Sequence, residues 1–169
     1  MSRMRLIGTL ALVGTALATV PARADGPFQY NSLSPCRVFD SRNAGAQANF
    51  TFTGQPLLNQ GPANPVPLNV RLRGVCGVVA AATAVTVNVT IVGPSHAGNL
   101  TLYPSNLAVR PVVSNINYAA LESALGNGGI VPLAPAGGAS DLSVYLDMAV
   151  IAPGGSAHVV LDVTGYFAP

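Results

Sequence analysis

The sequence predicts an all-β fold, an antiparallel β-sandwich or jelly roll of about eight to ten short strands held by one disulfide. Apolar and polar residues alternate with a period of two along much of the chain, as they do in half-buried strands. Clusters of Gly, Pro and Asn, which favour turns, separate the alternating segments. The chain also holds a single pair of cysteines, Cys36 and Cys76. Its 169 residues are enough for one domain with a substantial core.

Residues 1–24 have the features of a secretory signal peptide. Arg3 and Arg5 give a positive start, residues 6–20 are apolar, and residues 22–24 read Ala-Arg-Ala, a small-residue cleavage site. The apolar stretch is shorter than the roughly 18 residues of a transmembrane helix, and no later stretch reaches that length. We therefore expect a single domain over residues 25–169, secreted or at the cell surface, without a transmembrane span.

Charged residues make up only 8% of the chain, and the basic residues are all arginines. Loss of the signal peptide removes three of them and leaves a net charge of −1. A chain with this balance has no basic patch to follow a phosphate backbone, which excludes nucleic acid as a partner class. Weak charge repulsion favours self-association. We expect the partner to be another extracellular protein or a second copy of this chain, with a glycan as the alternative.

Cys36 and Cys76 both lie in the part of the chain that is expected to be exported, where oxidation joins cysteine pairs. Neither has a histidine close by in the sequence that would activate it as a reactive thiol. We therefore predict a disulfide between them. On the chain-entropy relation, closing a loop of about 40 residues stabilises a fold by about 4 kcal/mol.

The clearest predicted strand covers residues 83–92, where three valines and an isoleucine share one face. Residues 119–125 look helical, for about two turns. Further segments alternate as strands do: 49–53, 68–72, 99–103, 112–118, 129–133, 142–151 and 157–164.

Residues 25–33 and 43–67 are expected to be loop-like, because Gly, Pro and Asn interrupt them. Within the second segment, Phe50 and Phe52 form the only pair of large apolar residues on a common face. This pair either adds a short strand at the edge of the sandwich, which is the commoner arrangement, or belongs to a ligand-facing loop.

Two strand-like apolar segments near the ends of the mature chain each contain an aspartate, Asp40 and Asp162. A partly buried carboxylate is tolerated when it is paired and hydrogen-bonded. Arg37 and Arg42 flank the first aspartate and are the cations available to such pairs. We expect the first and last strands to lie side by side, with Asp40 or Asp162 receiving Arg37 or Arg42.

Six motifs follow one another along the chain: Ser-Pro-Cys-Arg-Val-Phe-Asp-Ser-Arg (34–42), Arg-Leu-Arg-Gly-Val-Cys-Gly-Val (71–78), Ala-Val-Thr-Val-Asn-Val-Thr (84–90), Gly-Asn-Leu-Thr-Leu-Tyr-Pro (98–104), Pro-Val-Val-Ser-Asn-Ile-Asn-Tyr (111–118) and Asp-Val-Thr-Gly-Tyr-Phe (162–167). In this order they resemble a family of secreted bacterial β-sandwich domains that occurs singly or in tandem in extracellular proteins. The resemblance implies bacterial origin and an extracytoplasmic role, and it carries no catalytic residues over to this chain. Ser41 departs from the family, which usually has threonine at that place.

Alternating polar residues outline a candidate ligand face that includes Tyr103, Asn115, Asn117 and Tyr118. Amide side chains could bind sugar hydroxyls and tyrosine rings could stack on sugars, although the chain has no Trp. We favour the alternative, a solvated outer face of a sheet. The two histidines stand apart from any acid or cysteine at metal-ligand spacing, so we expect neither a metal nor a cofactor.

Three classes of function are compatible with these patterns. A secreted or cell-surface structural or interaction module, without catalytic activity and able to self-associate, fits the low charge and the β-rich pattern best. A carbohydrate- or matrix-binding domain is the alternative, and it requires exposed tyrosines on a concave face. A hydrolase is the third class, and it requires Asp40, Asp162 or a histidine to lie open in a cleft.

Overall fold

The computed structural model describes residues 27–61, 66–149 and 154–169. Their regular secondary structure consists of antiparallel strands without a helix, which confirms the predicted all-β class. The predicted signal peptide at 1–24 lies outside the described residues.

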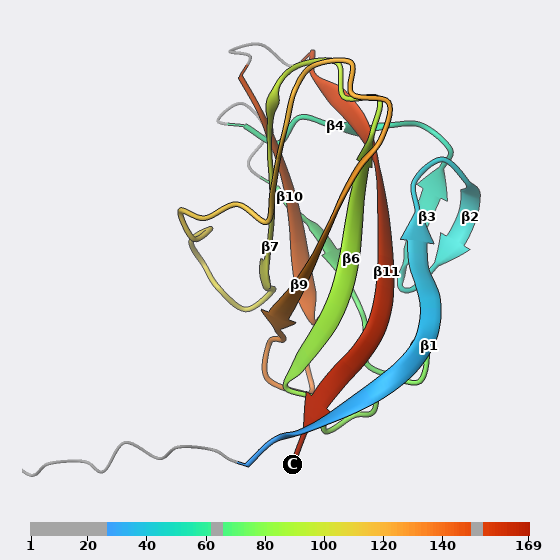
Figure 1. Ribbon diagram of the computed structural model, residues 1–169, viewed down its shortest axis with the longest axis vertical. Helices are drawn as coiled ribbons and strands as arrows, with labels where there is room; N and C mark the ends of the chain where they lie inside the picture. Colours follow the sequence, from blue (N-terminus) through green and yellow to red (C-terminus); the bar gives the residue numbers. More distant parts are fainter. Residues whose placement is uncertain (1–26, 62–65, 150–153) are drawn as a thin grey trace, which may run out of the picture.

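Two antiparallel sheets form the two layers of a sandwich (Figure 1). The five-stranded sheet has the order β1-β11-β6-β9, and β4 also pairs with β11. The four-stranded sheet has the order β5-β10-β7-β8, and β2 and β3 form a separate hairpin. The strand bounds are β1 Gln29–Asp40, β2 Ala44–Gln47, β3 Phe50–Thr53, β4 Leu57–Leu58, β5 Leu68–Val70, β6 Ala84–Val92, β7 Gly98–Pro104, β8 Ile116–Tyr118, β9 Leu125–Pro132, β10 Leu142–Met148 and β11 Ser156–Ala168.

The core lies between the two sheets and follows the alternation read from the sequence. In β6 every second residue, from Val85 to Ile91, is at most 3% exposed, while the residues between them are half-buried. In β11 the inward set runs from Ala157 to Val163, each of them 0% exposed. Leucines of β7 and β10, including Leu100 and Leu146, pack into the same core from the opposite sheet. Burial of these aliphatic side chains supplies most of the driving force for folding.

The two ends of the described chain lie side by side, as the aspartate-bearing segments predict. β11 is 13 residues long and pairs with β1 on one side and β6 on the other (Figure 1). Arg37 lies opposite Asp162 in this pairing, and Asp40 lies opposite Val160. Two register shifts interrupt β1 along its contact with β11. The last strand is therefore a central strand of the sheet and carries the first strand on its outer side.

The predicted disulfide is confirmed. Cys36 in β1 is bonded to Cys76 in the segment between β5 and β6, with 5.7 Å between the Cα atoms. The bond ties the edge strand of one sheet to a connection that starts in the other sheet. It therefore holds the β5–β6 connection covalently against β1.

Two segments that were expected to be loop-like contain strands. β1 begins at Gln29, inside the expected loop at 25–33, because the last strand extends far enough to pair with it. The segment 43–67 contains β2, β3 and β4. Phe52 is 3% exposed, and its ring stacks on that of Phe39 with 5.0 Å between the ring centres. The contact between Phe39 and Phe52 therefore anchors the β2–β3 hairpin to β1.

The prediction of a helix at 119–125 is wrong, because this segment is irregular up to the start of β9. The amide of Leu121 donates to the carbonyl of Pro94, and the amide of Gly93 donates to the carbonyl of Glu122, so this segment bonds across to another loop. β9 then begins at Leu125. A helix of two turns has little stability of its own, and cross-loop hydrogen bonds overrode its local propensity.

Candidate functional site

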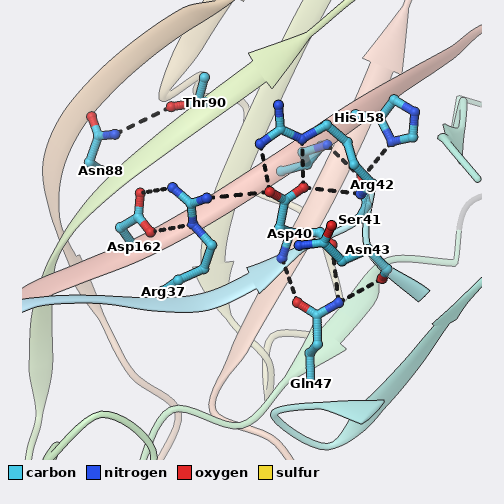
Figure 2. A network of polar contacts seen from close by, with 11 residues as sticks. Arg37, Asp40, Ser41, Arg42, Asn43, Gln47, Asn88, Thr90, His158 and Asp162 are labelled. Carbon is cyan, nitrogen blue, oxygen red and sulfur yellow. Dashed lines mark hydrogen bonds and ion pairs between the residues drawn. The ribbon is translucent and has the colours of Figure 1, made fainter. Parts of the chain in front are cut away.

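The four predicted ion-pair residues form one network where β1 and β11 meet (Figure 2). Arg42 donates from Nε and Nη2 to the Asp40 carboxylate at 2.8 and 2.6 Å. Arg37 donates from Nε and Nη2 to Asp162 at 2.8 and 3.2 Å. Its Nη1 also donates to Asp40 Oδ2 at 3.3 Å, so Arg37 bridges the two carboxylates. Asp40 is only 2% exposed, which makes it the buried centre of the network.

Backbone contacts of Asp40 shape the end of β1. Its Oδ1 accepts the amide of Arg42 at 3.0 Å, the pattern by which aspartate stabilises a turn two residues on. Gln47, on the β2–β3 hairpin, forms hydrogen bonds to the same turn. Its Oε1 accepts the amide of Asp40 at 2.8 Å, and its Nε2 donates to the carbonyls of Asp40 and Asn43. Asp40 therefore connects the last strand, through Arg37, to the hairpin that follows β1.

The same contacts determine the ionisation of Asp40. Hydrogen bonds from the Arg42 side chain hold the pKa of Asp40 below its ordinary value, against burial, which acts in the opposite direction. The hydrogen bond to Asp162 raises the pKa of Arg37. Asp40 is consequently ionised at neutral pH and acts as an acceptor, which does not suit the role of a general acid.

Asp40→Asn is expected to lower the free energy of unfolding at neutral pH by about 1–2 kcal/mol, because the partly exposed arginines lose a charged acceptor. Since the folded pKa of Asp40 is lowered, its contribution is present above the unfolded value near 3.8 and is lost as the pH falls through the folded pKa. Urea unfolding measured from pH 7 to pH 3 should therefore show that the free energies of unfolding of the wild type and of Asp40→Asn approach each other in acid. The control is Glu122→Gln, which should leave stability unchanged. A constant difference at all pH values would contradict this account.

Ser41 and His158 are also in contact beside this network (Figure 2). The hydroxyl of Ser41 lies 3.1 Å from His158 Nδ1, a distance typical of a nucleophile and its base. Ser41 is, however, 0% exposed, and its oxygen accepts the amide of Val159 at 2.9 Å. Its own amide donates to the carbonyl of Val159 at 3.0 Å. Ser41 therefore extends the pairing of β1 with β11 and is not accessible to a substrate.

A second buried ion pair, which the sequence analysis did not identify, joins two loops at one end of the sandwich. Asp141 is 4% exposed, and its Oδ2 accepts the amides of Leu72 and Arg73 at 2.7 and 2.9 Å. The Arg73 guanidinium is paired with Asp141 Oδ1. It also donates to the carbonyl of Ala82 at 2.6 Å and to that of Ala134 at 2.8 Å. Arg73 and Asp141 thus hold the β5–β6 and β9–β10 connections together.

A cavity of about 640 Å³ opens beside this pair. Arg71 lies on its wall and donates to the backbone carbonyls of Gly138 and Ala139. Since the guanidinium groups of Arg71 and Arg73 are both bonded to loop carbonyls, the charged lining of the cavity serves to hold the loops.

The candidate ligand face is only partly as expected. Tyr103 and Tyr118 are each 5% exposed, and burial raises the pKa of both. The hydroxyl of Tyr118 donates to the carbonyl of Asp147 at 3.2 Å. Asn115 Oδ1 accepts the amide of Leu102, and Asn117 alone of the four is exposed. Neither tyrosine offers a stacking surface: Tyr118 packs into the core, and Tyr103, which alternates with the core residue Leu102 on β7, is covered on the outer face of its sheet.

A different surface stands out nearby, on the connection between β7 and β8, which projects from the sandwich (Figure 1). The predicted strand at 112–118 is regular only from Ile116 onward. Four large apolar side chains within this connection are exposed, and we call them the apolar loop surface: Leu107 (45%), Val109 (79%), Val112 (102%) and Val113 (58%).

Arg110 anchors the apolar loop surface to the four-stranded sheet. Its guanidinium lies 4.5 Å from the centre of the Tyr145 ring, and Nη2 donates to Asp147 Oδ2 at 3.0 Å. A shallow hollow of about 310 Å³ remains between Arg110, Val112, Val113 and the exposed Asn117. The loop therefore presents apolar side chains outward while its cation is turned back onto the sheet.

Within the residues that the structure describes, no three His, Cys, Asp or Glu side chains gather as a metal site requires. The same residues include no helix long and apolar enough to cross a membrane. Comparison with protein-family models, with curated proteins and with solved structures finds no match for this chain.

Proposed function

We propose that this chain is a secreted or cell-surface structural or interaction module of a bacterium, which works by contact with other proteins and without catalysis. The observation that carries the proposal is the apolar loop surface. Exposed apolar side chains that cluster on one loop mark interaction sites on soluble proteins, whereas isolated ones are ordinary. Here four lie within seven residues, from Leu107 to Val113, and three of them are more than half exposed.

The roles of the charged side chains support the same proposal. Asp40, Asp162 and Asp141 are each engaged by arginine. These contacts hold strands and loops in place. Asp141 lines the cavity of about 640 Å³, but both of its carboxylate oxygens accept hydrogen bonds from Leu72 and Arg73. The signal-peptide pattern, the disulfide and the resemblance to secreted bacterial β-domains all favour an extracytoplasmic location.

A test of this proposal expresses the full chain in a bacterial host with a photo-crosslinking residue at Val112. We expect a disulfide-bonded product that begins at Asp25 and is recovered outside the cytoplasm. On illumination it should form covalent adducts with protein. The matched control carries the same residue at Val79, which is 40% exposed in the β5–β6 connection and should form none.

The two parts of the proposal fail separately in this experiment. An uncleaved chain with reduced cysteines inside the cell would contradict the extracytoplasmic location. Adducts that are missing at Val112, or equally strong at Val79, would contradict the role of the apolar loop surface.

A further inference from the structure

The five-stranded sheet ends at β9, whose outer edge has no strand partner within the described residues (Figure 1). On its inner edge β9 pairs with β6 through all eight residues, without a register shift. An unpaired strand exposes a row of amide and carbonyl groups that can bond to another strand. β9 is therefore an edge to which a further strand can be added.

β9 lacks the features by which proteins usually block such an edge. Those features are charged side chains, prolines within the strand and bulges. β9 reads Leu-Gly-Asn-Gly-Gly-Ile-Val-Pro, with no charge and with its only proline at the final position. The opposite edge strand, β1, has two register shifts and contains Pro35 and Arg37. One edge of the sheet is protected in this way, and the other is open.

The side chains of β9 leave the first half of its outward face flat. Val131 is 2% exposed and faces the core, so Asn127 and Leu125 share the inward face by alternation. Consistent with this, Asn127 Nδ2 donates to the carbonyl of Asn115. The outward face then consists of Gly126, Gly128, Ile130 and Pro132, and Ile130 is 62% exposed. Two of these four positions, both in the first half of the strand, have no side chain.

This pattern is complementary to itself. Two identical strands can pair antiparallel about a two-fold axis that is perpendicular to the sheet. One residue then lies opposite the same residue of the second copy, with the axis between them, and every other pair of opposite residues shares a face of the sheet. With the axis at Gly128, Ile130 lies opposite Gly126 of the second copy, and Gly126 lies opposite Ile130 of the second copy. Each isoleucine then covers the space that a glycine leaves open.

We propose that two copies of this chain associate through β9, edge to edge, with Gly128 on the two-fold axis. The proposal rests on the interaction role given above and names a second copy of the chain as a partner. It continues the five-stranded sheet into a sheet shared by both copies. A single-strand interface is at the small end of protein–protein contacts, so the dimer should depend on protein concentration.

A cysteine at Gly128 tests both the contact and its register. A Cβ built at Gly128 meets only the carbonyl oxygen of Val87, at 3.7 Å, so the side chain fits. Opposite Cα atoms in an antiparallel pair lie about 4.5–5.5 Å apart, within the range of roughly 4.4–6.8 Å that disulfides bridge. Gly128→Cys should therefore form a covalent dimer on mild oxidation. Ile130→Cys is the matched control, because its two copies would lie about 13 Å apart in this register and should not cross-link.

Sedimentation of the native, disulfide-bonded protein provides the second measurement. The wild-type chain should shift from monomer to dimer as concentration rises, with increased hydrogen-exchange protection confined to β9. Ile130→Lys should abolish the shift, because Ile130 is exposed in the monomer and a lysine would place two charges at the contact. Val109→Lys, on the apolar loop surface, should dimerise as the wild type does.

A wild-type chain that stays monomeric at every concentration, or a dimer that survives Ile130→Lys, would overturn the β9 contact. Either result would leave the adducts at Val112 unaffected, so failure of the dimer is distinguishable from failure of the proposed function. Cross-linking of Ile130→Cys in place of Gly128→Cys would overturn the register.

Discussion

Asp141→Ala is expected to lower the free energy of unfolding by about 3–5 kcal/mol, because removing the carboxylate from this buried ion pair leaves the Arg73 charge without its partner. The Arg73 side chain is 11% exposed and would keep its charge without its carboxylate. The amides of Leu72 and Arg73 would lose their acceptor as well. A domain of this size is stable by about 5–15 kcal/mol, so the loss is a large share of the total. Urea unfolding at pH 7 measures it.

The pH dependence provides a check on the mechanism. Burial alone would raise the pKa of Asp141, but the amides of Arg73 and Leu72 and the Arg73 guanidinium hold it below its ordinary value. The stabilising effect is therefore present above the unfolded pKa near 3.8 and disappears as the pH falls through the folded pKa. Wild type and variant should converge in stability in acid.

Two further variants separate the charge from the packing. Asp141→Asn keeps the size of the side chain but not its charge, and should still lose part of the stability because Arg73 remains unpaired. Glu122→Gln, the control, removes an acid that is in no ion pair of the described residues and should have no effect. A loss below about 1 kcal/mol for Asp141→Ala would show that solvent reaches Arg73 and replaces the carboxylate.

The contrast between the two ion-pair networks shows how far sequence reasoning reaches. Asp40 and Asp162 could be brought together because both sit in apolar strands that bracket the domain, and terminal strands often pair. Asp141 and Arg73 are 68 residues apart, in connections without periodicity. No local pattern indicates which two loops meet, since that depends on how the strands are ordered in the sheets.

β9 shows a second limit. The sequence predicts a strand only from residue 129, whereas β9 begins at Leu125. Glycines at 126, 128 and 129 lower strand propensity because they offer no side chain to pack. Pairing with β6 through eight residues compensates for this. The idea that the tyrosines of the candidate ligand face are exposed is wrong for a related reason. Alternation shows which residues share a face of a strand, but not whether that face is covered by other parts of the chain.

The paired variant Cys36→Ser with Cys76→Ser is expected to lose about 4 kcal/mol of stability, since the bond closes a loop of 40 residues. The loss arises mainly in the unfolded chain, which becomes free to expand. The native contacts on either side of the bond do not depend on it, because the ion pairs Arg37–Asp162 and Arg73–Asp141 do not involve the cysteines. The folded variant should therefore retain its sheets, and its circular dichroism should match that of the wild type.

An expanded unfolded state exposes more surface, so the dependence of the unfolding free energy on urea should become steeper in this variant. Reduction of the wild-type protein should reproduce both changes. If instead the variant loses stability with an unchanged urea dependence, the bond acts on the folded state by holding the β5–β6 connection against β1. Equal stability with and without the bond would mean that other contacts already restrict the unfolded chain. In both cases the entropic account of the Cys36–Cys76 bond would be wrong.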